Sequence, residues 1–225
     1  MPASAQLLWE PRKSPVQARS AASVDAILEA TIQVLLKVGK ERLTTTRVAE
    51  RAGVSVGTLY QYFPNKSALL RAVLRRHFDQ VLEAVEQACR EQQGNTVEQM
   101  ATALITAFLS AKMREPQSSV ALYSVSADVD GAKIVKQMVA RMNQAMVAML
   151  ASARPPLTKD PQLIASLLQG AMSGVSRQLL ESPNPEERFA TLRDELIFLA
   201  TAYLNASIAS PRRKSAHTRN GQPRA

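Results

Sequence analysis

The sequence predicts an all-α protein, and three observations lead to that prediction. Of the 225 residues, 46% are hydrophobic but only 4% are aromatic, and abundant Ala, Leu, Met and Gln favour helices. Apolar residues recur at three- and four-residue spacings, which place them on one helical face. No stretch alternates apolar and polar residues between turns, as sheet strands would. We therefore expect about nine helices and no sheet.

The N-terminal part predicts three short elements. In the first, residues 23–39, Ser23 is suited to the N-cap and Gly39 to the C-terminal stop. Two short helices are expected over residues 45–52 and 56–62. Residues 1–22 lack periodicity and predict a mobile basic arm.

The remaining two thirds of the chain predict longer helices. Asn65 is placed to cap a helix that ends near Gln92. Further helices are expected over residues 96–113, 118–126, 128–152, 162–180 and 185–206. Residues 211–225 are poor in apolar side chains, which predicts a disordered tail.

The basic charge is concentrated at the two ends. The chain has 28 Lys and Arg against 19 Asp and Glu, a net charge of +9. Residues 1–66 have a net charge of +4, residues 67–210 are neutral, and residues 211–225 have a net charge of +5. This distribution favours contact with a polyanion at one end and another role for the middle, although a solubilising surface explains it too.

Several classes of protein are disfavoured by the residues that the sequence lacks. One cysteine, Cys89, and two histidines, His77 and His217, do not suggest a disulfide framework or a metal site. No catalytic serine elbow or phosphate-binding glycine loop is present, so we expect no enzyme and no cofactor. No segment suits a signal peptide or a membrane span, so we expect a cytoplasmic protein. Cys89 is either an inert thiol or a redox sensor.

Residues 45–62, TTRVAERAGVSVGTLYQY, have the spacing of a helix-turn-helix. Ala49 permits the two helices to cross closely, and Gly53 suits a turn with positive φ. Ser55 is placed to cap the second helix. The apolar positions that should form the small shared core are Val48, Ala52, Val54 and Leu59.

Together with the Ile27–Ala30 segment, residues 44–55, 57–60, 62–66 and the Leu69-Leu70 pair resemble the DNA-binding domain of TetR-type transcriptional regulators. The resemblance covers about residues 20–72. It implies an all-α homodimer with an N-terminal operator-binding domain, over residues 23–66, and a C-terminal effector-binding and dimerisation domain, over residues 67–210. It also implies repression that a small effector relieves. An architectural or nucleoid-associated DNA-binding protein of the same fold, without an effector, is the alternative.

The second helix of the motif should enter the major groove of double-stranded DNA. The residues expected to contact bases are Ser55, Val56, Gly57, Thr58 and Gln61. Those expected to contact phosphates are Thr45, Thr46, Arg47, Tyr60, Tyr62 and Lys66. The family resemblance also implies phosphate contacts for Tyr60 and Lys66. In the arm, Arg12, Lys13 and Arg19 either reach an adjacent groove or remain solvated.

The last two predicted helices contain long uncharged stretches, which suggests that a second copy of the chain covers them. The expected dimer interface is Leu163, Leu167, Gly170, Ala171, Gly174, Leu196, Leu199 and Tyr203. A buried core within one protomer is the alternative.

Methionines form a stripe along the helix expected over residues 128–152, at Met138, Met142, Met146 and Met149. Methionine adapts to irregular ligands, but such a stripe also suits an ordinary core. A largely apolar effector pocket is expected from Phe108, Leu122, Tyr123, Met138, Met142, Met146, Gln169, Met172 and Ser176. Arg114 or Gln169 would orient a polar group of the effector.

Overall fold

The computed structural model describes residues 18–126 and 131–208. Within these ranges the chain forms nine helices, and its β-pairing is limited to an isolated bridge between Leu157 and Ile208. The prediction of an all-α fold is confirmed. The helices are α1 (Ala18–Arg42), α2 (Thr45–Ala52), α3 (Val56–Tyr62), α4 (Lys66–Glu91), α5 (Val97–Met113), α6 (Pro116–Ser126), α7 (Gly131–Ala151), α8 (Pro161–Leu180) and α9 (Pro185–Asn205).

The first helix differs from its prediction at both ends. It begins at Ala18, so residues 18–22 of the expected arm are helical and Ser23 lies inside the helix. Ala18, Ala21 and Ala22 favour helix strongly enough to extend it beyond a plausible cap. Gly39 interrupts the helix with φ 76°, as expected of a C-terminal glycine, but one more turn follows it. The rest of the arm and the basic tail, residues 211–225, lie outside the described residues.

Side-chain caps fix where most of the other helices begin. Ser55 accepts a hydrogen bond from the Thr58 N–H, and Asn65 accepts one from Ala68, which confirms both predicted caps. Helix α5 begins one residue later than predicted because Thr96 is its cap, in a reciprocal box with Gln99. Helix α6 begins two residues earlier than predicted, at Pro116. Helix α7 is described from Gly131, and the predicted start at residue 128 lies outside the described residues.

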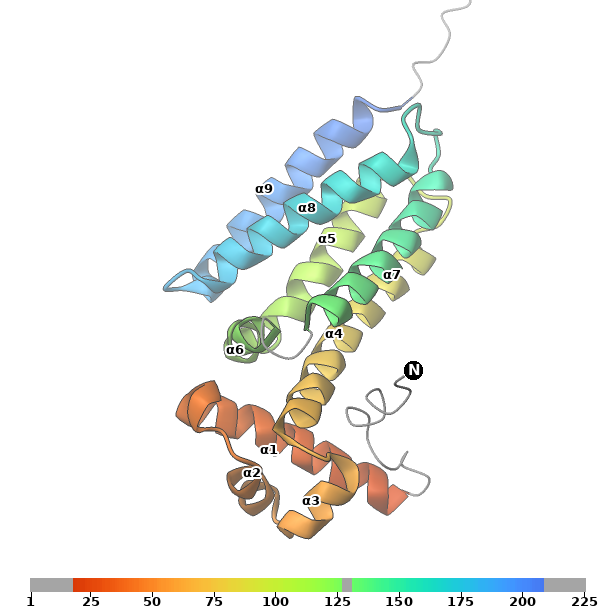
Figure 1. The fold of residues 1–225 in the computed structure, drawn as a ribbon. Helices are drawn as coiled ribbons and strands as arrows, with labels where there is room; N and C mark the ends of the chain where they lie inside the picture. Colours follow the sequence, from red (N-terminus) through yellow and green to blue (C-terminus); the bar gives the residue numbers. More distant parts are fainter. Residues whose placement is uncertain (1–17, 127–130, 209–225) are drawn as a thin grey trace, which may run out of the picture.

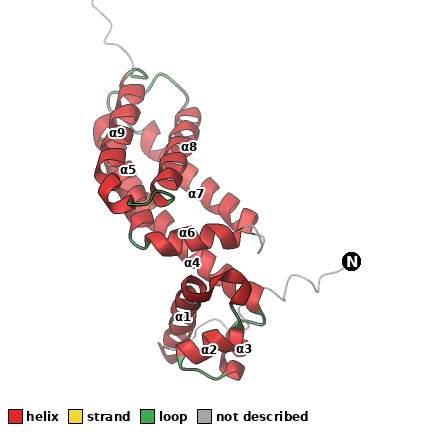
Figure 2. Cartoon of the chain, turned by 90° about the vertical axis from the view of Figure 1, so that its left-hand side faces the viewer, coloured by secondary structure: helices red, strands yellow, loops and turns green. Residues whose placement is uncertain are grey.

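The buried side chains form two clusters that α4 connects. The N-terminal cluster is built from α1 to α4 and is completed by Leu122 and Val125 of α6 and Ile134 of α7. The C-terminal cluster is built from the rest of α4 with α5, α7, α8 and α9. Helix α4 therefore runs from one cluster into the other (Figure 1). Helix α6 lies across the junction between the clusters (Figure 2). A displacement of either helix would therefore disturb the packing of both clusters.

None of the helices described here is long and apolar enough to cross a membrane.

Candidate nucleic-acid interface and effector domain

Helices α2 and α3 form the helix-turn-helix that the sequence predicts. Gly53 ends α2 with φ 68°, and the Val54 N–H donates to the Ala49 carbonyl across the turn. Of the predicted shared core, Val48 and Leu59 are completely buried, as is Ala49 at the crossing, apart from 1% of its surface. Ala52 and Val54 are half-buried against the same cluster. The turn thus positions α3 at the far end of the molecule from α8 and α9 (Figure 1).

The outward side of α3 is formed by the residues expected to contact bases. Ser55, Gly57 and Gln61 are exposed, whereas Val56 and Thr58 are half-buried. The Ser55 and Thr58 hydroxyls are 2.8 Å apart, which fixes the first turn of the helix. A Cβ added at Gly57 would meet only the Ser55 hydroxyl, at 3.7 Å. Packing within the protein therefore does not explain glycine at this position.

Two of the hydroxyls expected to contact phosphates lie together. The Thr45 and Tyr60 hydroxyls are 3.1 Å apart, and both residues lie at the surface where α2 meets α3. One hydroxyl of such a pair donates a hydrogen bond to the other. The accepting hydroxyl still has its own O–H to donate a hydrogen bond to a phosphate oxygen. Thr46 is exposed beside them.

Arg47 and Lys66 have internal partners that the sequence did not indicate. The Arg47 guanidinium donates to the Arg42 carbonyl at 2.7 Å, and the Lys66 ammonium donates to the Lys40 carbonyl at 2.7 Å. Both cations therefore anchor the end of α1, where carbonyls lack helical partners. Each retains further donors for a phosphate.

Tyr62 differs from the prediction. Its side chain is only 8% exposed and belongs to the N-terminal cluster, because it lies two residues from Tyr60 and so on the opposite face of α3. Burial removes the basis for its predicted phosphate contact.

A second exposed surface lies on α8 and α9. We call Leu163, Leu167, Phe198 and Leu199 the α8–α9 apolar face; their exposed fractions are 53%, 52%, 72% and 57%. Gly170 and Gly174 are exposed along the same side of α8, and an added Cβ at either would meet nothing within 4 Å. Figure 1 shows α8 and α9 side by side at the outer edge of the domain. An exposed apolar patch of this kind is typical of a protein–protein interface.

Three residues of the predicted dimer interface lie elsewhere. Leu196 is buried in the C-terminal cluster, so it cannot contact a second chain. Ala171 and Tyr203 are half-buried against that cluster. Sequence reasoning missed Phe198, although the helical spacing of Leu196, Ala200 and Leu204 already placed the core face of α9 on the other side.

The residues expected to line an effector pocket mostly pack as core. Phe108, Met142, Met146 and Met172 are buried in the C-terminal cluster, and Met138 packs against both clusters. Leu122 belongs instead to the N-terminal cluster. In this structure the methionines of the stripe are packed in or against the C-terminal cluster.

The polar members of the expected pocket have distinct surroundings. The Gln169 side chain donates to the Val139 carbonyl at 3.1 Å. The Ser176 hydroxyl is fully buried without a hydrogen-bond partner, and Tyr123 is 40% exposed. Arg114, the other residue expected to orient an effector, is exposed at the end of α5.

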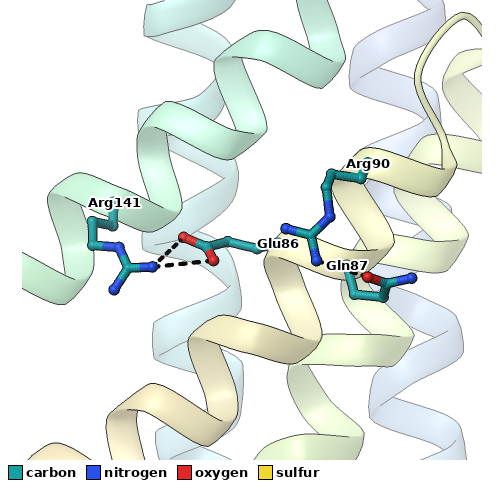
Figure 3. Close-up of polar contacts among 4 residues, drawn as sticks. All are labelled: Glu86, Gln87, Arg90 and Arg141. Carbon is teal, nitrogen blue, oxygen red and sulfur yellow. Dashed lines mark hydrogen bonds and ion pairs between the residues drawn. The ribbon is translucent and has the colours of Figure 1, made fainter.

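Two surface hollows lie outside that set of residues. One, of about 610 Å³, separates α1 from the start of α6 and from the loop between α8 and α9. The other, of about 360 Å³, lies between α4 and α7 and includes Cys89. At this groove the Arg141 guanidinium of α7 donates to both carboxylate oxygens of Glu86, at 2.9 and 3.2 Å (Figure 3). The ion pair links α7 to the long helix that enters both clusters.

The environment of Cys89 makes its thiol unreactive. Burial raises the pKa of its thiol to about 12, with a smaller contribution from Glu86. We expect the thiol of the folded protein to react with a disulfide reagent at pH 8 at least about 100-fold more slowly than in urea, because only the thiolate is nucleophilic. Since the folded pKa is raised, the unfolded chain loses this proton first, and stability should fall above about pH 9. Equal reaction rates in buffer and in urea would contradict this expectation.

The fold and the motif define a helix-turn-helix transcriptional regulator. Residues 27–73 match the family model described as bacterial regulatory proteins, tetR family, and residues 96–204 match a tetracyclin repressor-like C-terminal domain. The repressor KstR of Mycolicibacterium smegmatis is 32% identical over 144 residues, which cover 63% of this chain and 69% of KstR. KstR of Rhodococcus jostii is 30% identical, with coverage of 63% and 65%. The chain thus spans about two thirds of the length of these relatives.

Solved structures agree in fold. A TetR-family regulator from Mesorhizobium loti has a TM-score of 0.71 at 20% identity, covering 86% of this chain and all of the other. The regulator FadR of Bacillus subtilis, solved in complex with stearoyl-CoA, has a TM-score of 0.66 at 16% identity, covering 79% and 97%. The chain belongs to the TetR family of transcriptional regulators.

Proposed function

We propose that this protein is a dimeric repressor that binds a two-fold symmetric DNA operator through α3 and is released by a small effector bound among α4 to α9. The observation that carries the proposal is the outward side of α3, which presents polar groups and a glycine with no internal packing role. Helix α3 would enter the major groove with Ser55, Gly57 and Gln61 toward base edges. The Thr45 and Tyr60 hydroxyls, together with Thr46, would hold the adjacent backbone.

The α8–α9 apolar face supports the dimer. Four large apolar side chains at the surface cost free energy in water, and a second copy of the face would bury them. The exposed Gly170 and Gly174 would let two α8 helices approach closely. A two-fold pairing would give the two α3 helices the symmetry of the operator.

The connection between the two clusters supports effector control. Helix α4 contributes Val73 and Leu74 to one cluster and Val81 and Val85 to the other. An effector that binds one arrangement of α4 to α9 more tightly would shift the population toward it, and so change the separation of the two α3 helices. KstR is a repressor, and one FadR structure holds stearoyl-CoA, which fits this class of mechanism.

Two variants of α3 test the DNA contacts at one fixed salt concentration. We expect Gln61→Ala to weaken binding to the operator by about 5- to 100-fold and binding to random DNA hardly at all, because glutamine is suited to pair with adenine. We expect Tyr60→Phe to weaken binding to both DNAs by the same factor, because a phosphate contact is independent of sequence. Gel shifts measure both, with Gln80→Ala on the exposed side of α4 as the matched control. Equal losses on both DNAs for Gln61→Ala would remove its base-contacting role.

A further inference from the structure

A buried lysine lies at the junction of the two clusters. Lys112, in the last turn of α5, is only 3% exposed. Its ammonium lies 5.4 Å from the ring centroid of Phe78 on α4 and 5.0 Å from that of Tyr123 on α6. No carboxylate in the described part of the chain forms an ion pair with it. Aromatic faces attract a cation only weakly, so the ammonium is buried without a full counter-charge.

Apart from the two aromatic rings, the described neighbours of Lys112 include polar groups but no acid paired with it. His77 of α4 is a titratable neighbour of Lys112; burial first, and then Lys112, lower the pKa of this imidazole to about 4. The imidazole is therefore neutral at pH 7, and its Nε2 lies 3.4 Å from the Ser119 hydroxyl of α6. On α8, Arg177 is paired with Glu181 at 2.8 Å. Neither His77 nor Arg177 therefore supplies a negative charge to the Lys112 ammonium.

A second unsatisfied group lies beside Tyr123. The Ser176 hydroxyl of α8 is fully buried and has no hydrogen-bond partner. Burial raises the pKa of the neighbouring Tyr123 phenol and a polar interaction with the Ser176 hydroxyl lowers it, but the two groups do not reach hydrogen-bond geometry. A buried hydroxyl without a partner is rare, because it forfeits its hydrogen bonds to water. Tyr123, itself 40% exposed, thus lies beside both the Lys112 ammonium and the Ser176 hydroxyl.

From this geometry we infer that Lys112 and Ser176 form the binding site for the anionic group, a carboxylate or a phosphate monoester, of an otherwise apolar effector. The oxyanion would replace the Tyr123 ring over the Lys112 ammonium and accept a hydrogen bond from Ser176. The apolar part would pack among Phe108 and the methionines of α7, whose flexible side chains adapt to a ligand. The inference deepens the proposed function by assigning the chemical class of its effector.

The position of the site would couple the anion to the DNA-binding domain. Tyr123 lies on α6, whose Leu122 and Val125 are buried in the N-terminal cluster beside α1. Moving Tyr123 aside would displace α6 against α1, as well as acting through α4. The charged group of the effector, and not only its apolar part, would therefore change the position of α3.

A test without any ligand concerns the stability of the protein. Burial lowers the pKa of the Lys112 ammonium to about 8. The group is therefore still charged at pH 7 in the folded protein, and its burial lowers the free energy of unfolding. We expect Lys112→Met to raise the Tm by about 2–4 °C at pH 7, because methionine removes the uncompensated charge and has a volume similar to that of lysine. Because the folded pKa is lowered, the wild-type protein should regain stability relative to this variant between about pH 8 and 10.5. A Tm that falls in Lys112→Met would show that the lysine is structural and would overturn the site.

Binding of defined probes tests the site directly. Decanoate, decyl phosphate, decanol and decylamine are titrated into the full chain by calorimetry without DNA. We expect the wild-type protein to prefer one or both anions to decanol by at least about 10-fold, and to bind decylamine least. The stronger of the two anions distinguishes a carboxylate from a phosphate effector.

Variants connect that preference to the two residues. Lys112→Met should lose about 10- to 100-fold in anion affinity and little for decanol, and Ser176→Ala about 3- to 10-fold without loss of stability. Lys136→Met, on the exposed side of α7, is the matched control and should bind as the wild-type protein does. Equal affinity for decanol, or no binding of either anion, overturns the inference. Operator binding by ligand-free Lys112→Met is measured separately, so a failure of the DNA-binding proposal is distinguishable.

Discussion

Replacing Phe198 with glutamate is expected to abolish the dimer and to lower operator affinity by about 100-fold or more. Phe198 is 72% exposed, the largest exposed fraction among the four residues of the α8–α9 apolar face. In a dimer, the two binding events on one operator are linked, and linkage of this kind contributes about 10²–10⁴ to affinity. A charge placed in an apolar interface would also face its own copy across the two-fold axis and would have no partner.

The measurement combines sedimentation, which gives the oligomeric state, with a gel shift on the operator. Val120→Glu is the matched control, because Val120 is an exposed apolar residue on α6, outside this face. It should leave both the dimer and operator binding intact. A Phe198→Glu variant that remains dimeric would place the interface elsewhere.

Replacing Leu59 with alanine is expected to cost about 2–5 kcal/mol of the free energy of unfolding. Leu59 is fully buried where α3 packs on the rest of the N-terminal cluster. Removal of a buried leucine loses its transfer free energy and leaves a cavity that only partly collapses. Such a loss is a large share of the total stability of a typical domain, about 5–15 kcal/mol.

Urea unfolding of the full chain, followed by circular dichroism, measures this cost. Leu36→Ala is the control, because Leu36 is 42% exposed on α1 and its truncation should cost far less. Operator binding by Leu59→Ala should fall in parallel, since α3 would lose its anchor. A cost equal to that of the control would show that Leu59 does not hold α3.

Local signals explain why the helix-turn-helix was predictable in detail. Gly53 and the caps Ser55 and Asn65 interact with residues only a few positions away, so the local sequence is enough to predict their effect. The start of α1 was wrong by five residues, because helix propensity upstream of Ser23 outweighed a plausible cap.

Tertiary packing explains what the sequence did not indicate. Tyr60 and Tyr62 look equivalent in the chain, but only the fold shows that Tyr62 faces the core. Likewise, Leu196 and Phe198 are both apolar, but Leu196 is buried and Phe198 is exposed. This difference depends on which side of α9 packs against α5. The burial of Lys112 was not expected from a lysine in the last turn of a helix, because it depends on α4 and α6 closing over it.

The central claim is that this chain binds a two-fold symmetric operator as a dimer through α3. Selection of bound duplexes from a random DNA library, at one stated salt concentration, tests it most directly. The claim predicts that the wild-type protein enriches an inverted repeat whose half-sites are spaced by one helical turn, about 10 base pairs, or a multiple of it. Gln61→Ala should enrich a less restricted half-site. Enrichment of no sequence, or of a site without two-fold symmetry, would contradict the claim.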